Sequence, residues 1–133
     1  MKLFMMVLCF FVMLCISNID IANCEEIDIS GYKKCIEKDI STFGIAECAA
    51  KATNFWDKKL NVAYKKLMSM QETAEKKKIL KDAQLSWIRY RDKTSSLYTI
   101  LEEGSIAQLN ANVWYMEATK DRAKFLEAFI QEE

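Results

Sequence analysis

The chain has very few residues that interrupt a helix. Its 133 residues include no proline and three glycines, Gly31, Gly44 and Gly104. Proline and glycine are the residues that most strongly disfavour a helix interior. A chain nearly free of both has few points at which the backbone must turn, so the sequence predicts long helices joined by short connections.

Apolar and small side chains recur every three or four residues in three stretches, which is the repeat of one helical face. We expect helices at residues 45–70, 73–101 and 106–131. Short connections between them force neighbouring helices to lie antiparallel. The apolar face expected for the second helix consists of Ile79, Leu80, Ala83, Trp87, Tyr90, Leu97, Tyr98 and Leu101.

The connection between the second and third helices carries its own signals. Gly104 follows the second apolar repeat, where a glycine commonly ends a helix. Ser105 is then expected as the N-cap of the third helix, with Gln108 completing a capping box. The expected fold class is all-α, an antiparallel three-helix bundle with a short N-terminal segment, residues 27–40, that contains one helical turn.

The first residues have the layout of a secretion signal. Lys2 precedes an unbroken apolar run over residues 3–16, and a more polar segment follows. The run is shorter than the roughly 20 residues that a membrane-spanning helix needs. Small side chains three and one positions before Glu25 favour cleavage there. We therefore expect a signal peptide at residues 1–24 and one helical domain at residues 25–133.

Residues 21–24 also resemble a lipoprotein box, in which Cys24 would carry a lipid. An asparagine next to the cysteine fits that motif poorly, so the lipid-anchored form is the less favoured alternative. A membrane is expected as a partner only through such a lipid. The favoured localisation is export to the periplasm or secretion.

The five cysteines divide by position. Cys9 and Cys15 lie in the apolar run and Cys24 lies at the cleavage point, which leaves Cys35 and Cys48 in the mature domain. An even number in a small exported chain predicts a disulfide, and its 12-residue loop corresponds to about 3 kcal/mol in the chain-entropy model. Two free thiols or metal ligands are the alternatives, but the chain has no histidine and no paired-cysteine motif.

Charge and composition argue against several function classes. The chain has 19 basic and 19 acidic side chains, without the basic stripe of a nucleic-acid-binding domain. Without histidine there is no ordinary serine or cysteine hydrolase triad, and no glycine-rich phosphate loop is present. We expect no cofactor, no metal and no enzymatic activity.

Polar residues set among aromatic ones are the candidate functional feature. The candidates on the three expected helices are Asp57, Asn61, Gln84, Trp87, Arg91 and Arg122. If the helices fold back, Asp57, Arg91 and Arg122 approach one another across the bundle. Two interpretations stay open: a structural network that fixes helix register, which is favoured, and a ligand-binding site.

With these residues the chain resembles the LprI-like lysozyme inhibitor N-terminal domain family, a group of small exported bacterial proteins. The resemblance rests on the order and spacing of Cys35, residues 46–49, residues 56–61, Tyr64, residues 83–84, Trp87, residues 90–92, residues 104–105, Thr119, Arg122 and Leu126. It implies a helical, disulfide-stabilised domain outside the cytoplasm of a bacterium. It also implies binding to a host or phage muramidase whose cleft is blocked.

The chain departs from the family pattern at a second disulfide. The family often has a further cysteine shortly after the Arg-Asp pair and a partner in the last helix, where this chain has residues 94–96 and 113–115. Contact between the second and third helices is then expected to rely on packing, with Trp114 or Tyr115 filling the space. The neutral net charge gives no general attraction for a basic lysozyme.

Two hypotheses follow. The first is an exported envelope or secreted binding protein that resembles lysozyme inhibitors and acts without catalysis, with contacts at Glu102, Glu103 and Ser105, because loops carry recognition. The second is a structural or stress-related envelope protein of unassigned role that does not bind lysozyme. It would bind another exported protein through Trp114 and Tyr115, if those rings are exposed.

Overall fold

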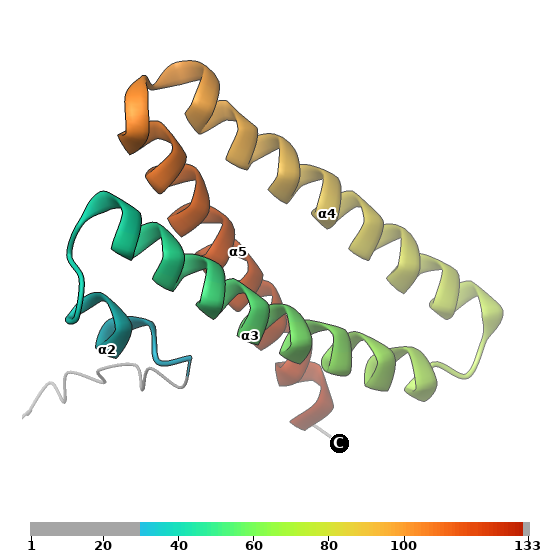
Figure 1. Ribbon diagram of the computed structural model, residues 1–133. Helices are drawn as coiled ribbons and strands as arrows, with labels where there is room; N and C mark the ends of the chain where they lie inside the picture. Colours follow the sequence, from blue (N-terminus) through green and yellow to red (C-terminus); the bar gives the residue numbers. More distant parts are fainter. Residues whose placement is uncertain (1–29, 132–133) are drawn as a thin grey trace, which may run out of the picture.

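Residues 30–131 of the computed structural model are described here, and every regular element in this range is a helix (Figure 1). The helices are α2 (Tyr32–Ile36), α3 (Thr42–Met70), α4 (Ala74–Leu101) and α5 (Gly104–Gln131). The predicted all-α class is confirmed, and the three long helices begin and end within three residues of the expected bounds. Residues 30–131 contain four helices, because the helical turn expected in the N-terminal segment forms α2 beside the three long helices. The predicted signal peptide and its cleavage point lie outside the described residues.

Helix α3 begins three residues before its apolar repeat does. The Ser41 hydroxyl accepts a hydrogen bond from the Gly44 N–H at 3.0 Å, which caps the first turn. Asp39 in turn accepts a bond from the Ser41 N–H at 2.9 Å. A Cβ atom at Gly44 would overlap the Asp39 side chain, so this position needs glycine. The apolar repeat misses this turn because Thr42 and Phe43 are exposed.

The other two long helices begin differently. The Thr73 hydroxyl accepts a bond from the Lys76 N–H at 3.2 Å and so caps α4. Helix α5 begins at Gly104, whose φ of 71° suits glycine. The capping box expected at Ser105 is wrong, because Ser105 already lies inside the helix. The Gln108 amide donates to Oδ1 of Asn112 at 2.8 Å.

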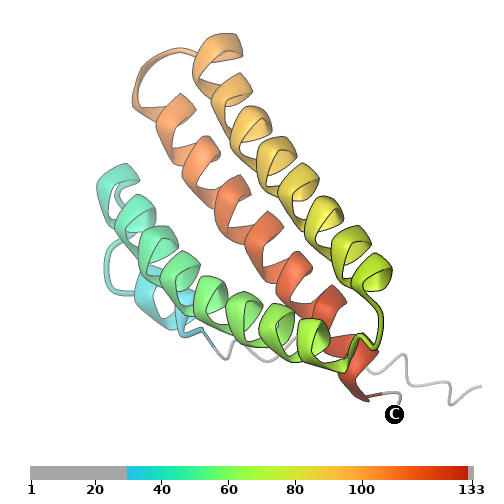
Figure 2. The ribbon, with the colours of Figure 1, turned by 90° about the vertical axis from the view of Figure 1, so that its right-hand side faces the viewer.

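The three long helices run up, down and up, and α5 holds the other two together (Figures 1 and 2). Helix α5 packs extensively on α3 and also on α4, whereas α3 and α4 make little direct contact with each other. A groove therefore remains between α3 and α4, and it is lined by side chains of both helices.

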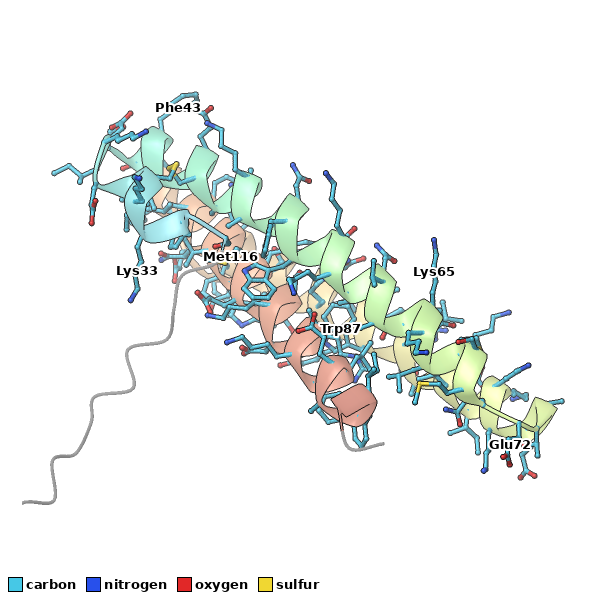
Figure 3. All side chains as sticks on the ribbon, turned by 90° about the horizontal axis from the view of Figure 1, so that it is seen from below. Lys33, Phe43, Lys65, Glu72, Trp87 and Met116 are labelled. Atoms are coloured by element: carbon cyan, nitrogen blue, oxygen red, sulfur yellow. A yellow bond between two sulfur atoms is a disulfide. The ribbon has the colours of Figure 1, made fainter. Side chains whose placement is uncertain are left out.

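The apolar core lies between α3 and α5. Its buried side chains are Ala49, Ala52, Trp56, Leu60, Ala63, Leu67, Met116, Ala123 and Leu126. The alanines let the two helices approach closely, and Met116 lies in the interior while Phe43 projects outward at the start of α3 (Figure 3). Helix α4 contributes only partly buried apolar side chains to this core, among them Leu80 and Trp87.

The predicted disulfide between Cys35 and Cys48 is present. It joins α2 to the second turn of α3, with the two Cα atoms 5.7 Å apart. Tyr32 of α2 packs against the core, and burial raises the pKa of its hydroxyl, with Glu117 adding to the effect. The bond therefore fixes a five-residue helix that buries no residue completely.

Candidate functional site

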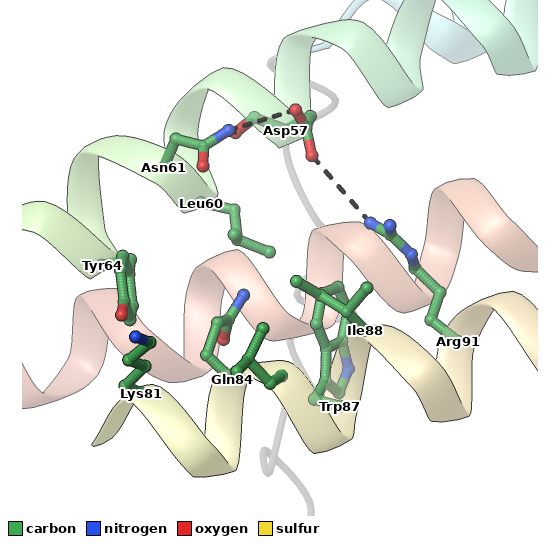
Figure 4. A pocket seen from close by; sticks show the side chains of 10 residues that line it. Asp57, Leu60, Asn61, Tyr64, Lys81, Gln84, Trp87, Ile88 and Arg91 are labelled. Carbon is green, nitrogen blue, oxygen red and sulfur yellow. Dashed lines mark hydrogen bonds and ion pairs between the residues drawn. The ribbon is translucent and has the colours of Figure 1, made fainter. Parts of the chain in front are cut away.

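Helices α3 and α4 face each other across a groove of about 220 Å³ (Figure 4). The lining residues are Asp57, Leu60, Asn61 and Tyr64 of α3 and Lys81, Gln84, Leu85, Trp87, Ile88 and Arg91 of α4. Five of the six residues singled out in the sequence line this groove. The sixth, Arg122, lies on α5 and contacts two of the lining residues, Gln84 and Trp87.

Arg91 connects all three long helices. Its guanidinium carbon lies 4.8 Å from the centre of the Trp87 ring and 4.1 Å from the centre of the Tyr115 ring. Its Nε donates to Asp92 at 3.1 Å and its Nη1 donates to the Thr119 hydroxyl at 3.4 Å. Since the side chain is 8% exposed, these contacts satisfy a cation that burial would otherwise penalise.

Asp57 lies at the rim of the groove. Its Oδ1 is 3.9 Å from Nη1 of Arg91, which is an ion pair at its outer limit and not a hydrogen bond. Asn61, one turn on, donates to Oδ2 of Asp57 at 3.1 Å and to its backbone carbonyl at 2.8 Å. The carboxylate is half exposed, so its attraction to Arg91 is screened by water.

Arg122 acts on the groove through Gln84 and Trp87. Its Nε donates to Oε1 of Gln84 at 3.0 Å, and its guanidinium lies 5.6 Å from the Trp87 ring centre and 5.2 Å from that of Phe125. Burial lowers the pKa of Arg122 from its ordinary value. The structure thus brings Asp57 close to Arg91, while Arg122 reaches Arg91 only through the indole of Trp87.

Trp114 and Tyr115 lie at the contact between α4 and α5, where the sequence predicts packing by these rings. The Trp114 ring lies 6.0 Å from the Tyr90 ring and 6.3 Å from the Tyr98 ring, both on α4. Tyr115 lies against Arg91, and burial raises the pKa of its hydroxyl although Arg91 acts in the opposite direction. Both rings are half-buried, so they do not form the exposed aromatic pair on which the second hypothesis depends.

At the connection between α4 and α5, not all of the expected contact residues are exposed. Glu103 and Ser105 are exposed, but Glu102 is half-buried and accepts a hydrogen bond from Asn110 at 2.7 Å. Four positions of the apolar face expected for α4 are exposed, so that part of the prediction is wrong. They are Ile79, Ala83, Leu97 and Leu101, and Ile100 and Ile106 near the connection are exposed as well.

Tyr90, which was also assigned to the buried face of α4, is exposed as well. The reason is that α4 packs mainly on α5 and makes little contact with α3, so an apolar face wide enough for two neighbouring helices is covered mostly by one. At the other end of α4, Ile79 lines a larger apolar groove of about 560 Å³ together with Phe125 and Phe129. A repeat of three and four residues indicates a helical face without showing how many helices cover it.

Two further findings concern chemistry that the described residues could support. Within residues 30–131, no group of three or more His, Cys, Asp or Glu side chains is arranged to hold a metal ion. None of the helices in this range is both long and apolar enough to cross a membrane.

Residues 30–131 thus form an all-helical, disulfide-linked domain with a groove between two of its long helices. Residues 35–126 match the family model described as "Lysozyme inhibitor LprI". The match covers well over half of the chain, and the chain belongs to this family. It includes both bonded cysteines and all six polar and aromatic candidates. Searches of curated proteins and of solved structures find no significant match.

Proposed function

We propose that the protein is an exported bacterial protein that binds a lysozyme-type enzyme through its surface and catalyses no reaction. The observation that carries this proposal is the family match over residues 35–126, which includes both bonded cysteines and most of the three long helices. Inhibition by binding requires a surface that the enzyme can contact, and the structure offers one at the connection between α4 and α5.

We define the α4–α5 corner as Leu97, Ile100, Leu101, Glu103 and Ile106, all of them exposed. Ile100 is 74% exposed and Leu101 is 76% exposed. Exposed apolar side chains gathered in this way mark protein-binding surfaces. The corner stands at one end of the molecule, where the chain reverses direction (Figures 1 and 2).

The shape and charge of the corner suit the cleft of a lysozyme. A projecting helix connection can enter a cleft, whereas the concave groove between α3 and α4 cannot. Glu103 places a carboxylate among the apolar side chains, and local complementarity to a basic enzyme does not require a net negative charge on the whole chain. The contact residues expected from the sequence, Glu103 and Ser105, therefore lie beside exposed apolar side chains that can contact the same partner.

An inhibition assay with the purified, disulfide-bonded protein and several lysozymes tests the proposal. Ile100→Ala should weaken binding about tenfold, the loss typical of a central interface side chain. Val62→Ala is the matched control, because Val62 is a similarly exposed β-branched residue on α3. Absence of binding to every lysozyme at micromolar concentration would contradict the function, and equal losses in both variants would contradict the corner.

Export is part of the proposal and needs its own measurement. Mass spectrometry of the mature protein should show a chain that starts at Glu25 and loses one disulfide when reductant is added. A lipid on Cys24 would contradict cleavage at Glu25 and would anchor the domain to a membrane. A reduced, full-length chain in the cytosol would contradict export altogether.

The alternative of a structural envelope protein has less support. It depends on Trp114 and Tyr115 as an exposed binding surface, and both rings are half-buried against α4. We therefore propose lysozyme-type binding as the single function to test first.

A further inference from the structure

Gln84 presents an unused hydrogen-bond donor to the groove. Its Oε1 accepts a bond from Nε of Arg122 at 3.0 Å. An arginine has only donors, so the oxygen of the Gln84 amide must face Arg122 and the nitrogen must face away from it. In Figure 4 this nitrogen points toward Leu60, across the groove. Arg122 thereby fixes Gln84 as a donor.

The orientation matters because Gln84 is almost completely buried, at 6% exposed. Its Nε2 makes no hydrogen bond to any residue in the described range 30–131. This nitrogen still has contact with solvent, because within that range Trp56 Nε1 is the side-chain atom that is both fully buried and without a hydrogen bond. A buried amide with unmet donors is costly and is normally satisfied by water or by a ligand. The open side of Nε2 is the groove.

The groove around Gln84 is richer in cations than in anions. Its lining carries Lys81 and Arg91 against one carboxylate, Asp57. Lys81 lies three residues before Gln84, so the two side chains share one face of α4. Asp57 is held at the far rim by Asn61 and lies 3.9 Å from Arg91. The end of the groove near Gln84 and Lys81 therefore has donors and positive charge without a carboxylate from the lining.

The size and the apolar lining of the groove restrict further which ligands fit it. A volume of about 220 Å³ is below the roughly 300 Å³ at which drug-sized ligand pockets begin, so the groove holds one small group. Leu60, Leu85 and Ile88 supply apolar contact beside the donors. The matching group is a carboxylate attached to a short apolar chain.

We propose that the groove between α3 and α4 binds the carboxylate of an apolar amino acid, either free or at the C-terminus of a peptide. Nε2 of Gln84 and the ammonium of Lys81 bind the carboxylate, and Leu60 and Ile88 contact the apolar side chain. This site is separate from the α4–α5 corner and does not depend on lysozyme binding, because the groove ends at Arg91 and the corner begins at Leu97.

Three small probes test the proposal by nuclear magnetic resonance titration of the disulfide-bonded protein. Leucine represents the free amino acid, N-acetyl-leucine represents a peptide C-terminus, and leucinamide lacks the carboxylate. Saturable shifts of the Gln84 side-chain amide and of the Leu60 and Ile88 methyl groups with leucine or N-acetyl-leucine at millimolar concentration support the site, and the tighter of the two identifies the source. The methyl groups report binding in the variants as well. Equal binding of leucinamide, or no saturable shift with any probe, would overturn it.

Gln84→Glu is the decisive variant, because it keeps the size of the side chain and a partner for Arg122 but replaces the donor with a negative charge. It should weaken probe binding at least tenfold, and Gln108→Glu on the exposed face of α5 is the matched control that should change it less than twofold. If Gln84→Glu fails to fold, Lys81→Glu on the surface serves instead, with Lys77→Glu as its control. Unchanged binding in the groove variant would refute the proposal.

Discussion

The interface between α3 and α5 and the interface between α4 and α5 are built in different ways. The first is an apolar core of small and aliphatic side chains, with Met116, Leu126 and Ala52 at 2% exposure or less. In the second, the only residues of α4 that are fully buried are the polar Gln84 and Arg91. Rings and guanidinium groups hold α4 to the rest, and its apolar side chains remain exposed at both ends.

This difference separates the part of the molecule that stabilises the fold from the part proposed to bind a partner. Apolar burial dominates the free energy of folding, so the α3–α5 interface carries most of it. Helix α4 is fixed by directional contacts that position Arg91 and Gln84 at the groove, and it leaves Ile100 and Leu101 exposed. The four predictions below test this division.

The largest effect is expected in the apolar core. Met116→Ala should lower the free energy of unfolding by about 2–5 kcal/mol, because it removes buried methylene groups and leaves a cavity. Leu101→Ala on the exposed end of α4 is the control and should change stability by less than about 0.5 kcal/mol. Urea unfolding followed by circular dichroism measures both, and similar losses would contradict the division.

Loss of the disulfide should have the next largest effect. Replacing Cys35 and Cys48 together by serine should cost about 3 kcal/mol, because the unfolded chain gains the freedom that the bond between two cysteines 13 positions apart removes. Hydrogen exchange should then speed up most in α2, which buries no residue completely. As a control, reductant should lower the melting temperature of the native protein and leave that of the double variant unchanged.

A smaller effect is expected when α4 loses its central cation. Arg91→Ala removes contacts to two rings and to Thr119, and it should cost about 2 kcal/mol. Arg89→Ala, at an exposed position on the same helix, should leave stability almost unchanged. An unaltered melting temperature for Arg91→Ala would show that the network is not structural.

The location of the helices could be predicted from the sequence, but their neighbours could not. Leu60 and Leu101 both belong to apolar repeats in the sequence, yet Leu60 is 4% exposed and Leu101 is 76% exposed. Local spacing determines which side chains share a face, whereas burial depends on which other helix covers that face. The repeat therefore located α4 correctly and predicted its burial wrongly.

The candidate site shows the same limit. The sequence predicts that Asp57, Arg91 and Arg122 approach one another, and in the structure Asp57 lies 3.9 Å from Arg91 whereas Arg122 contacts the Trp87 ring and does not line the groove. Sequence could not show that Arg122 turns the Gln84 amide, because that contact joins residues 38 positions apart. The apolar repeat also could not locate the start of α3, because the first turn is held by the Ser41 side-chain cap and not by buried apolar side chains.

The smallest predicted effect compares two exposed carboxylates with lowered pKa values, Asp39 before α3 and Asp82 in α4, because only one of them has a charged partner. Hydrogen bonding from Ser41, first from its side chain and then from its backbone, lowers the pKa of Asp39. A hydrogen bond from the Lys78 ammonium, 2.6 Å away, lowers the pKa of Asp82, and the positive charges of Lys78, Lys81 and Arg89 add to the effect. Both carboxylates therefore stabilise the fold above their unfolded pKa of about 3.9, and this contribution is lost as the pH falls through the folded values.

Salt separates the two causes. Raising the ionic strength to about 1 M shortens the screening length to about 3 Å, so the pKa of Asp82 should move back toward its ordinary value. The pKa of Asp39 should stay low, because its partner Ser41 is uncharged and a short hydrogen bond is not screened. Carboxyl resonances followed by titration at low and high salt measure both shifts. An equal response of the two groups would mean that charge, and not the Ser41 hydrogen bond, sets the acid stability at the start of α3.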